Sequence, residues 1–174
     1  MSDLTKIKAF AFDVDGIFTD GSVHVVAGGD LYRTFEAKDC LGVRMARMHG
    51  FPCGIVTGAS TESLPYRFHM MGIPDEDIYM HSRDKIVDFL AFCDAHGLAP
   101  EEVAFAGDDL PDIPVLQKCG FAVCPSDAVD EVKEVCDLVS SVPGGRGFVR
   151  SIVEMVMKAQ GCWTMDVAKY KAMF

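Results

Sequence analysis

The sequence lacks several features that would place it in familiar classes of protein. No apolar run approaches the roughly 18 residues that a membrane helix needs, and the N-terminus has neither the basic start nor the apolar middle of a signal peptide. No Cys-x-x-Cys pair occurs among its seven cysteines, and their odd number argues against a disulfide framework. These absences predict a soluble, cytoplasmic protein with reduced thiols and no membrane partner.

Positive charge is also scarce. The chain has 26 acidic and 16 basic residues and a formal net charge of −10 at pH 7. Such a protein repels phosphate backbones, so nucleic acid is excluded as a partner. An acidic pocket still binds an anionic substrate when a divalent cation lies between the carboxylates and the anion.

The 174 residues do contain a regular alternation of short apolar runs and longer amphipathic segments. Strands are expected at 7–12, 51–56, 78–80, 103–106, 121–124 and 138–139. Helices are expected from a cap at Asp39 to Gly50, and at 61–71, 85–96, 111–118, 129–135 and 148–159. This alternation predicts a single α/β domain over 1–174, with a doubly wound, Rossmann-like, mostly parallel sheet and helices on both faces. The last helix and tail occupy 147–174.

An inserted β-hairpin is expected over 21–37, after the first strand. Two runs rich in β-branched residues, 22–26 and 31–35, flank a glycine turn. Val23, Val25 and Leu31 leave these strands too apolar for a free hairpin in water, and a lone hairpin is too short to be stable. Pairing between subunits would bury that face, so the sequence predicts a homo-oligomer.

Polar residues cluster where the predicted strands end. Asp13 and Asp15 follow the first strand, Thr57 and Gly58 follow the second, and Lys85 opens a helix. Asp108, Asp109 and Asp112 follow the strand at 103–106. Ligands of such sheets bind beyond the carboxyl ends of the strands. Each Asp alone is typical of a turn or a helix cap, but several converging carboxylates need a cation, and oxygen ligands without His or Cys favour Mg²⁺.

This combination suits phosphoryl transfer to a carboxylate. One carboxylate attacks phosphorus, and a second, two residues on, protonates the leaving alkoxide and then deprotonates the water that cleaves the aspartyl phosphate. A threonine hydroxyl and a lysine ammonium hold the phosphoryl oxygens, while Mg²⁺ bridges nucleophile and phosphate.

Four segments together resemble the motifs of the haloacid dehalogenase superfamily, in order and spacing. They are Asp13-Val14-Asp15-Gly16, Thr57-Gly58, Lys85 and Gly107-Asp108-Asp109-x-x-Asp112. The segments 12–21 and 144–150 further resemble the capless branch, which includes phosphatases of eight- and nine-carbon ulosonate phosphates. The resemblance covers roughly residues 7 to 160.

The resemblance implies a role for each motif residue. Asp13 is the nucleophile, Asp15 the acid/base, and Thr57, Gly58 and Lys85 bind the phosphate. Mg²⁺ is held by Asp13, Asp108 and the Asp15 carbonyl, with Asp109 and Asp112 in support. The implied reaction is hydrolysis of 3-deoxy-D-manno-octulosonate 8-phosphate, in lipopolysaccharide biosynthesis, by a homotetramer in which a neighbour completes the site wall. A nine-carbon ulosonate 9-phosphate of a sialic-acid-like route is the alternative substrate.

Some positions leave the interpretation open. Ala59 stands where many relatives carry Arg or Glu, and 81–84 departs from the usual stretch before Lys85. The segment 144–147 is either an ordinary turn or an anion-binding loop whose Arg146 faces a sugar carboxylate.

Two other functions also remain open. One is a phospho-aspartate receiver, although receivers carry their acidic pair after strand one, where this chain has Asp-x-Asp. The other is a non-catalytic partner of a sugar-nucleotide synthase, against which the intact motif set argues.

Overall fold

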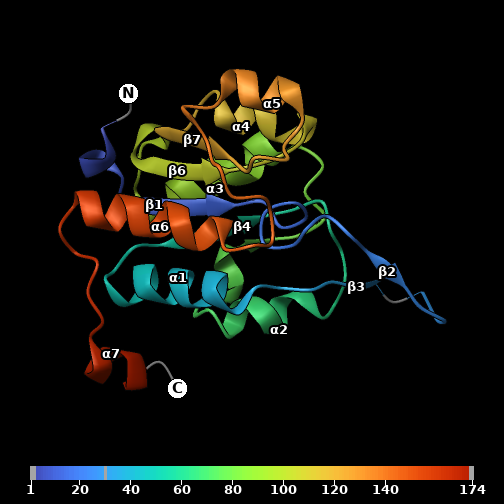
Figure 1. Cartoon of the computed structure of the whole chain (residues 1–174), viewed down its shortest axis with the longest axis horizontal. Helices are drawn as coiled ribbons and strands as arrows, with labels where there is room; N and C mark the ends of the chain where they lie inside the picture. Colours follow the sequence, from blue (N-terminus) through green and yellow to red (C-terminus); the bar gives the residue numbers. More distant parts are fainter. Residues whose placement is uncertain (1–2, 30, 173–174) are drawn as a thin grey trace.

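A computed structural model, which describes residues 3–29 and 31–172, has a six-stranded sheet at its centre (Figure 1). Its strands are β1 (Ala9–Phe12), β4 (Cys53–Val56), β5 (Ile78–Tyr79), β6 (Val103–Ala106), β7 (Phe121–Cys124) and β8 (Leu138–Val139). They lie in the order β5-β4-β1-β6-β7-β8, and every neighbouring pair is parallel. Because the chain leaves β1 towards one side and returns to its other side at β6, the crevice of this Rossmann-like sheet opens beyond β1. The predicted fold class is confirmed.

Helices cover both faces of the sheet. On one face lie α1 (Ala37–Met48), α2 (Leu64–His69) and α6 (Phe148–Ala159), and on the other α3 (Lys85–His96), α4 (Ile113–Leu116) and α5 (Asp130–Val135). Phe10 and Phe12 of β1 pack into the first layer, whereas Ala9 and Ala11 pack into the second. Burial on both sides explains why the strands are continuous apolar runs.

A cluster of phenylalanines lies beneath the loop that follows β1. The Phe18 ring meets the Phe12 ring edge-on at 5.3 Å and the Phe68 ring at 6.1 Å, and all three side chains are buried. Truncating such a buried ring to alanine costs about 3–5 kcal/mol. Phe18 therefore anchors the loop 13–21 on the core.

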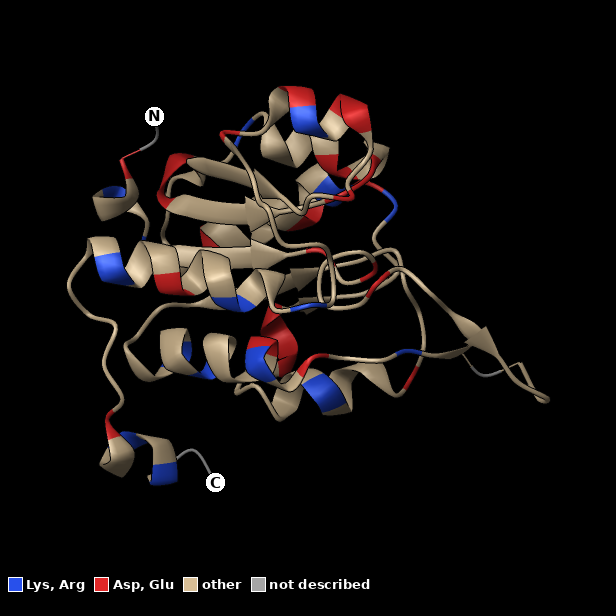
Figure 2. Ribbon diagram, in the orientation of Figure 1, with Lys and Arg blue, Asp and Glu red and all other residues tan. Residues whose placement is uncertain are grey.

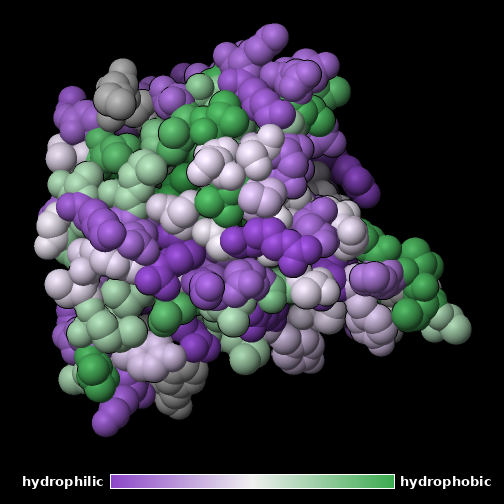
Figure 3. Space-filling view, viewed as in Figure 1, coloured by the Kyte–Doolittle hydropathy of each residue, from purple (hydrophilic) through white to green (hydrophobic). Residues whose placement is uncertain are grey.

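The hairpin projects from this core. Its strands β2 (His24–Val25) and β3 (Leu31–Tyr32) form a separate antiparallel sheet, with Val25 opposite Leu31. The hairpin reaches away from the sheet in Figure 1, and its outer part is apolar in Figure 3. The prediction of an inserted hairpin is confirmed, although its paired strands are shorter than expected. Asp30 of the predicted turn and residues 173–174 of the predicted tail lie outside the described residues.

The expectation that Asp39 caps α1 is wrong. The N-cap is Glu36, whose carboxylate accepts a hydrogen bond from the Lys38 amide at 3.1 Å. Asp39 lies fully buried in the first turn and accepts from the Gly147 and Arg150 amides at 3.2 and 2.7 Å. Asp39 therefore caps the N-terminus of α6 rather than that of α1. The two segments are more than 100 residues apart in the sequence and meet only in the folded chain.

Smaller differences concern the ends of helices. The helix expected at 61–71 is confined to α2, and Pro65 lies in its first turn, as the steric limits on proline require. The segment after Asp109 is a 3₁₀ turn, Leu110–Asp112, that continues into α4. A further helix, α7 (Val167–Ala172), was not expected and lies near α1. No helix within the described ranges is long and apolar enough to span a bilayer.

Candidate active site

The ends of three neighbouring strands surround a cavity of about 510 Å³. Asp13 follows β1, Thr57 follows β4 and Asp108 follows β6, because the carboxyl ends of parallel strands meet at one edge. Of the predicted site residues, the structure brings seven to the cavity wall: Asp13, Asp15, Thr57, Gly58, Lys85, Asp108 and Asp109. Ala59, Ser82 and Arg83 line it as well.

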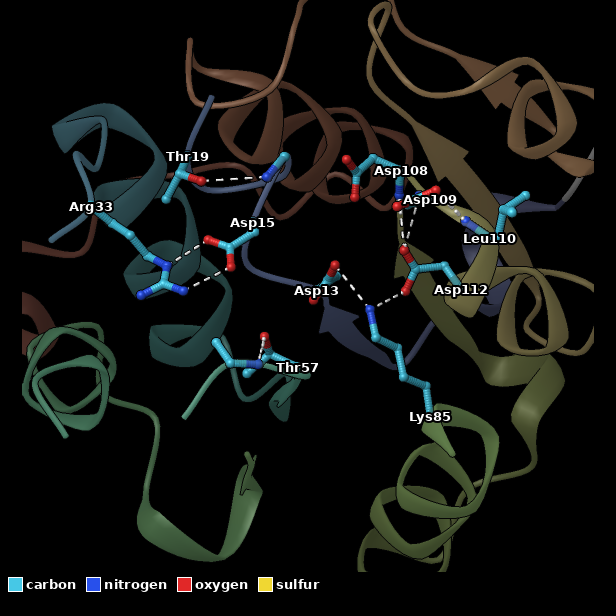
Figure 4. A network of polar contacts seen from close by, with 12 residues as sticks. Asp13, Asp15, Thr19, Arg33, Thr57, Lys85, Asp108, Asp109, Leu110 and Asp112 are labelled. Atoms are coloured by element: carbon cyan, nitrogen blue, oxygen red, sulfur yellow. Dashed lines mark hydrogen bonds and ion pairs between the residues drawn. The ribbon is translucent and has the colours of Figure 1, made fainter. Parts of the chain in front are cut away.

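Lys85 links two carboxylates on one side of this cavity (Figure 4). Its Nζ lies 2.9 Å from Asp13 Oδ2 and 2.7 Å from Asp112 Oδ1, and the side chain is buried. Burial lowers the pKa of Lys85, but Asp13 and Asp112 outweigh it, and the net effect is a raised pKa. Lys85 is therefore an ammonium ion that orients Asp13.

Asp112 is the support of the cluster. It is fully buried, and its second oxygen, Oδ2, accepts hydrogen bonds from the amides of Asp108 and Asp109 at 3.1 and 3.3 Å. Asp109 is itself exposed, and its Oδ1 accepts from the Leu110 amide at 2.8 Å. Asp112 thus ties Lys85 to the loop that carries Asp108.

The acidic cluster has the donor set of a divalent-metal site. Asp13, Asp108 and Asp112 each place one oxygen within 4.8 Å of the others. Burial, with repulsion from neighbouring carboxylates, raises the pKa of Asp13 to about 7 and that of Asp108 to about 8. A cation would relieve this repulsion. Since both oxygens of Asp112 already accept hydrogen bonds, Asp13 and Asp108 have the oxygens to offer, and hard ligands of this kind fit Mg²⁺.

Close packing of glycine backbone shapes the loop after β1. Gly16 has φ +79°, and a Cβ at this position would lie 1.9 Å from Asp108 Oδ2. The buried Thr19 hydroxyl accepts from the Gly16 and Gly21 amides at 3.3 and 3.2 Å. On the outside, a Cβ at Gly144 would lie 1.8 Å from the Gly16 carbonyl oxygen. The glycines of 144–147 therefore let this segment support the loop.

Thr57 lies across the cavity from Lys85 (Figure 4). It is buried, its amide donates to the Tyr79 carbonyl at 2.9 Å, and its hydroxyl accepts from the Ala59 amide at 3.2 Å. The hydroxyl proton is free to turn towards a bound oxyanion. Ser82, which sequence reasoning missed, lies in the same wall and has a buried hydroxyl without a partner among the described residues.

Two arginines lie in places that the sequence did not indicate. Arg33 of the hairpin forms two hydrogen bonds to Asp15, at 2.6 and 3.0 Å, and no local spacing signals a pair 18 residues apart. Arg146 does not line the cavity, and its largely exposed side chain lies 3.5 Å from Asp20. Its role towards a sugar carboxylate stays a prediction.

Comparisons with known proteins agree with this geometry. A family model described as haloacid dehalogenase-like hydrolase matches residues 72–150. The 3-deoxy-D-manno-octulosonate 8-phosphate phosphatase of Escherichia coli (strain B / BL21-DE3) is 32% identical over 169 residues, which span 97% of this chain and 88% of that protein.

Solved structures of phosphatases with the same name share the fold of this chain and have a comparable sequence identity. The phosphatase of that name from Yersinia pestis has a TM-score of 0.89 and 29% identity, covering 92% of this chain and 85% of the other. The one from Moraxella catarrhalis, in complex with magnesium, phosphate and a KDO molecule, has a TM-score of 0.87 and 30% identity, covering 91% and 90%.

Fold, acidic cluster and similarity together define a phosphatase of the haloacid dehalogenase-like class. Within that class, the chain belongs to the 3-deoxy-D-manno-octulosonate 8-phosphate phosphatase family. This membership favours the enzyme over the receiver and over a non-catalytic partner.

Proposed function

We propose that this protein is a Mg²⁺-dependent phosphatase that converts 3-deoxy-D-manno-octulosonate 8-phosphate to the free sugar acid and phosphate through an aspartyl phosphate. The observation that carries the proposal is the pairing of Asp13 with the buried Lys85 ammonium, in a cavity that also contains Asp15, Thr57 and Asp108. A carboxylate nucleophile, an acid/base and phosphate ligands are thereby gathered in one place. The family to which the chain belongs supports the choice of substrate.

In this proposal the substrate phosphate lies between Thr57 and Lys85. The Thr57 hydroxyl, the Gly58 amide and the Lys85 ammonium bind its oxygens. The Asp13 and Asp108 carboxylates and the Asp15 carbonyl hold Mg²⁺, which when bound supplies positive charge to the nucleophile and the phosphate. Asp109 and Asp112 support this arrangement, and Asp112 does so through its bonds to Lys85 and the Asp108 amide.

The reaction then has two steps. The Asp13 carboxylate attacks phosphorus, the bond to the sugar oxygen breaks, and Asp15 gives its proton to that oxygen. Asp15 next takes a proton from a water molecule, which attacks phosphorus and releases inorganic phosphate and the Asp13 carboxylate. Lys85 keeps its proton throughout and stabilises the negative charge that develops on the phosphoryl oxygens.

The remaining expectations also belong to the proposal. The apolar hairpin supports a homotetramer in which a neighbouring chain completes the wall of the site. All seven cysteines are free thiols, which supports a location in the reducing cytoplasm. Arg146 is the proposed ligand of the sugar carboxylate.

The test is phosphate release from three substrates, each with and without Mg²⁺. They are the eight-carbon ulosonate 8-phosphate, a nine-carbon ulosonate 9-phosphate and a neutral aryl phosphate. We expect turnover of all three only with Mg²⁺, and the highest kcat/KM for the eight-carbon compound. A preference for the nine-carbon compound would reassign the substrate, and the absence of metal-dependent turnover would overturn the proposed function.

A further inference from the structure

The acid/base candidate Asp15 is held by a residue from outside the four motifs. Arg33 Nε donates to Asp15 Oδ1 at 2.6 Å and Arg33 Nη2 donates to Asp15 Oδ2 at 3.0 Å, so the guanidinium binds both carboxylate oxygens (Figure 4). A two-point contact of this kind fixes the plane of a carboxylate as well as its position. A lone hydrogen bond would leave the carboxylate free to rotate.

Arg33 is itself held in place. Its Nη1 donates to the Thr61 hydroxyl at 2.9 Å, and its side chain is 5% exposed. Thr61 lies just before α2, and Arg33 lies just after β3, so the contact joins the base of the hairpin to the loop between β4 and α2. Phe35 fixes the same base, because its ring packs on those of Phe18 and Phe68 at 6.2 Å each.

We propose that Arg33 is a positioning residue that sets the orientation of the Asp15 carboxylate for both proton transfers. The inference rests on the role proposed above for Asp15. The leaving sugar oxygen and the attacking water occupy the same side of the phosphorus in turn, so one fixed carboxylate orientation serves both steps. Misplacement of a catalytic group by about 1 Å costs roughly 10²-fold in rate. The hairpin, through Arg33, is thus a part of the catalytic apparatus.

The test is a double-mutant cycle of Arg33→Ala and Asp15→Asn, with kcat and KM measured for the eight-carbon sugar phosphate and for an aryl phosphate. If Arg33 acts through Asp15, Arg33→Ala lowers kcat roughly 10- to 100-fold and leaves KM within about twofold. The same substitution then changes little in the Asp15→Asn background, because the group that it positions is already inactive. Arg33→Lys, with one ammonium in place of the fork, recovers only part of the loss.

Arg67→Ala is the matched control. Arg67 stacks over the Phe35 ring with its guanidinium carbon 5.5 Å from the ring centre, so it packs against the base of the hairpin without a contact to Asp15. We expect its kcat to stay near that of the unmodified protein. Thermal melting of each variant identifies those that have lost the fold, and Arg33→Lys keeps the test decisive if Arg33→Ala is one of them.

The outcomes separate this inference from the proposed function. Equal losses from Arg33→Ala in both backgrounds, or a loss confined to KM, would overturn the positioning role. So would a kcat for Arg33→Ala that equals that of the Arg67→Ala control. Full activity of Asp15→Asn would instead overturn the acid/base assignment on which the inference rests.

Discussion

The carboxylate cluster at the sheet edge and the hairpin beside it are built in opposite ways. In the cluster, Asp13, Lys85 and Asp112 are 6%, 7% and 0% exposed, and these three side chains form ion pairs with one another. In the hairpin, Val25 is 75% exposed, and β2 carries no Lys, Arg, Asp or Glu (Figure 2). The difference teaches that the carboxylates and the lysine of the proposed phosphate site lie buried within one chain, whereas the outer hairpin exposes an apolar surface that the proposed homotetramer would cover.

The largest expected effect lies at the centre of the cluster. Asp13→Asn should abolish turnover, because a neutral amide is a poor nucleophile and a weaker Mg²⁺ ligand. The measurement is phosphate release from the sugar phosphate and from an aryl phosphate. Circular dichroism should show an unchanged fold. Turnover comparable to that of the unmodified protein would refute the nucleophile assignment.

The next comparison separates the buried support from its exposed neighbour. Asp112→Ala leaves Lys85 with one carboxylate partner and the Asp108 and Asp109 amides without an acceptor. Removing one partner of a buried ion pair lowers the free energy of unfolding by about 3 kcal/mol. The turnover of Asp112→Ala should fall as well. Asp109→Ala removes only an exposed cap and should cost about 1 kcal/mol. Urea denaturation measures the loss in free energy of unfolding for each variant. Equal losses for Asp112→Ala and Asp109→Ala would contradict the support role of Asp112.

The pH dependence of Mg²⁺ binding sharpens the electrostatic part of the comparison. The raised pKa values of Asp13 and Asp108, about 7 and about 8, mean that the metal-free site still holds protons near neutrality. Mg²⁺ must displace these protons, so its affinity should fall as the pH is lowered, by roughly tenfold per unit between pH 8 and 7 and by roughly a hundredfold per unit below 7, where both carboxyls are protonated.

Calorimetry in buffers of different ionisation enthalpy measures both the Mg²⁺ affinity and the number of protons released.

The raised pKa values of Asp13 and Asp108 also predict that the metal-free protein loses stability as the pH rises from about 4 to about 8, because these carboxyls ionise at lower pH in the unfolded chain than in the folded one. Mg²⁺ should remove this loss. A pH-independent Mg²⁺ affinity between pH 6 and 9 would contradict the raised pKa values.

The smallest expected effect on the fold lies in the hairpin. Val25→Glu places a charge on the exposed apolar surface, so it should leave the stability of the single chain within about 0.5 kcal/mol. It should nevertheless dissociate the proposed homotetramer and lower sugar-phosphate turnover by roughly tenfold. Light scattering gives the mass. A fully active monomer of the unmodified protein at assay concentrations would rule out a neighbouring chain in the site.

Sequence reasoning reached the cluster because the rule behind it is local. Asp13 and Thr57 directly follow a buried apolar run, Asp108 follows one after a single glycine, and the ends of parallel strands meet by topology alone. Arg33 could not be found in this way, since its contact depends on how far the hairpin folds back. Asp39 was misassigned for the same reason, because the amides that donate hydrogen bonds to its carboxylate, those of Gly147 and Arg150, are more than 100 residues away.

The central claim, that Asp13 carries the phosphoryl group, is tested most directly by trapping it. The Asp15→Asn variant is mixed with an aryl phosphate and Mg²⁺. The first step still proceeds, because an aryl leaving group needs no general acid. The second step is slow, because the variant lacks the general base that activates water, so the aspartyl phosphate should accumulate. Acid quenching and borohydride reduction followed by peptide mass spectrometry should then find residue 13 converted to homoserine. A phosphoryl adduct on another residue, or none while phosphate is still released, would contradict the account.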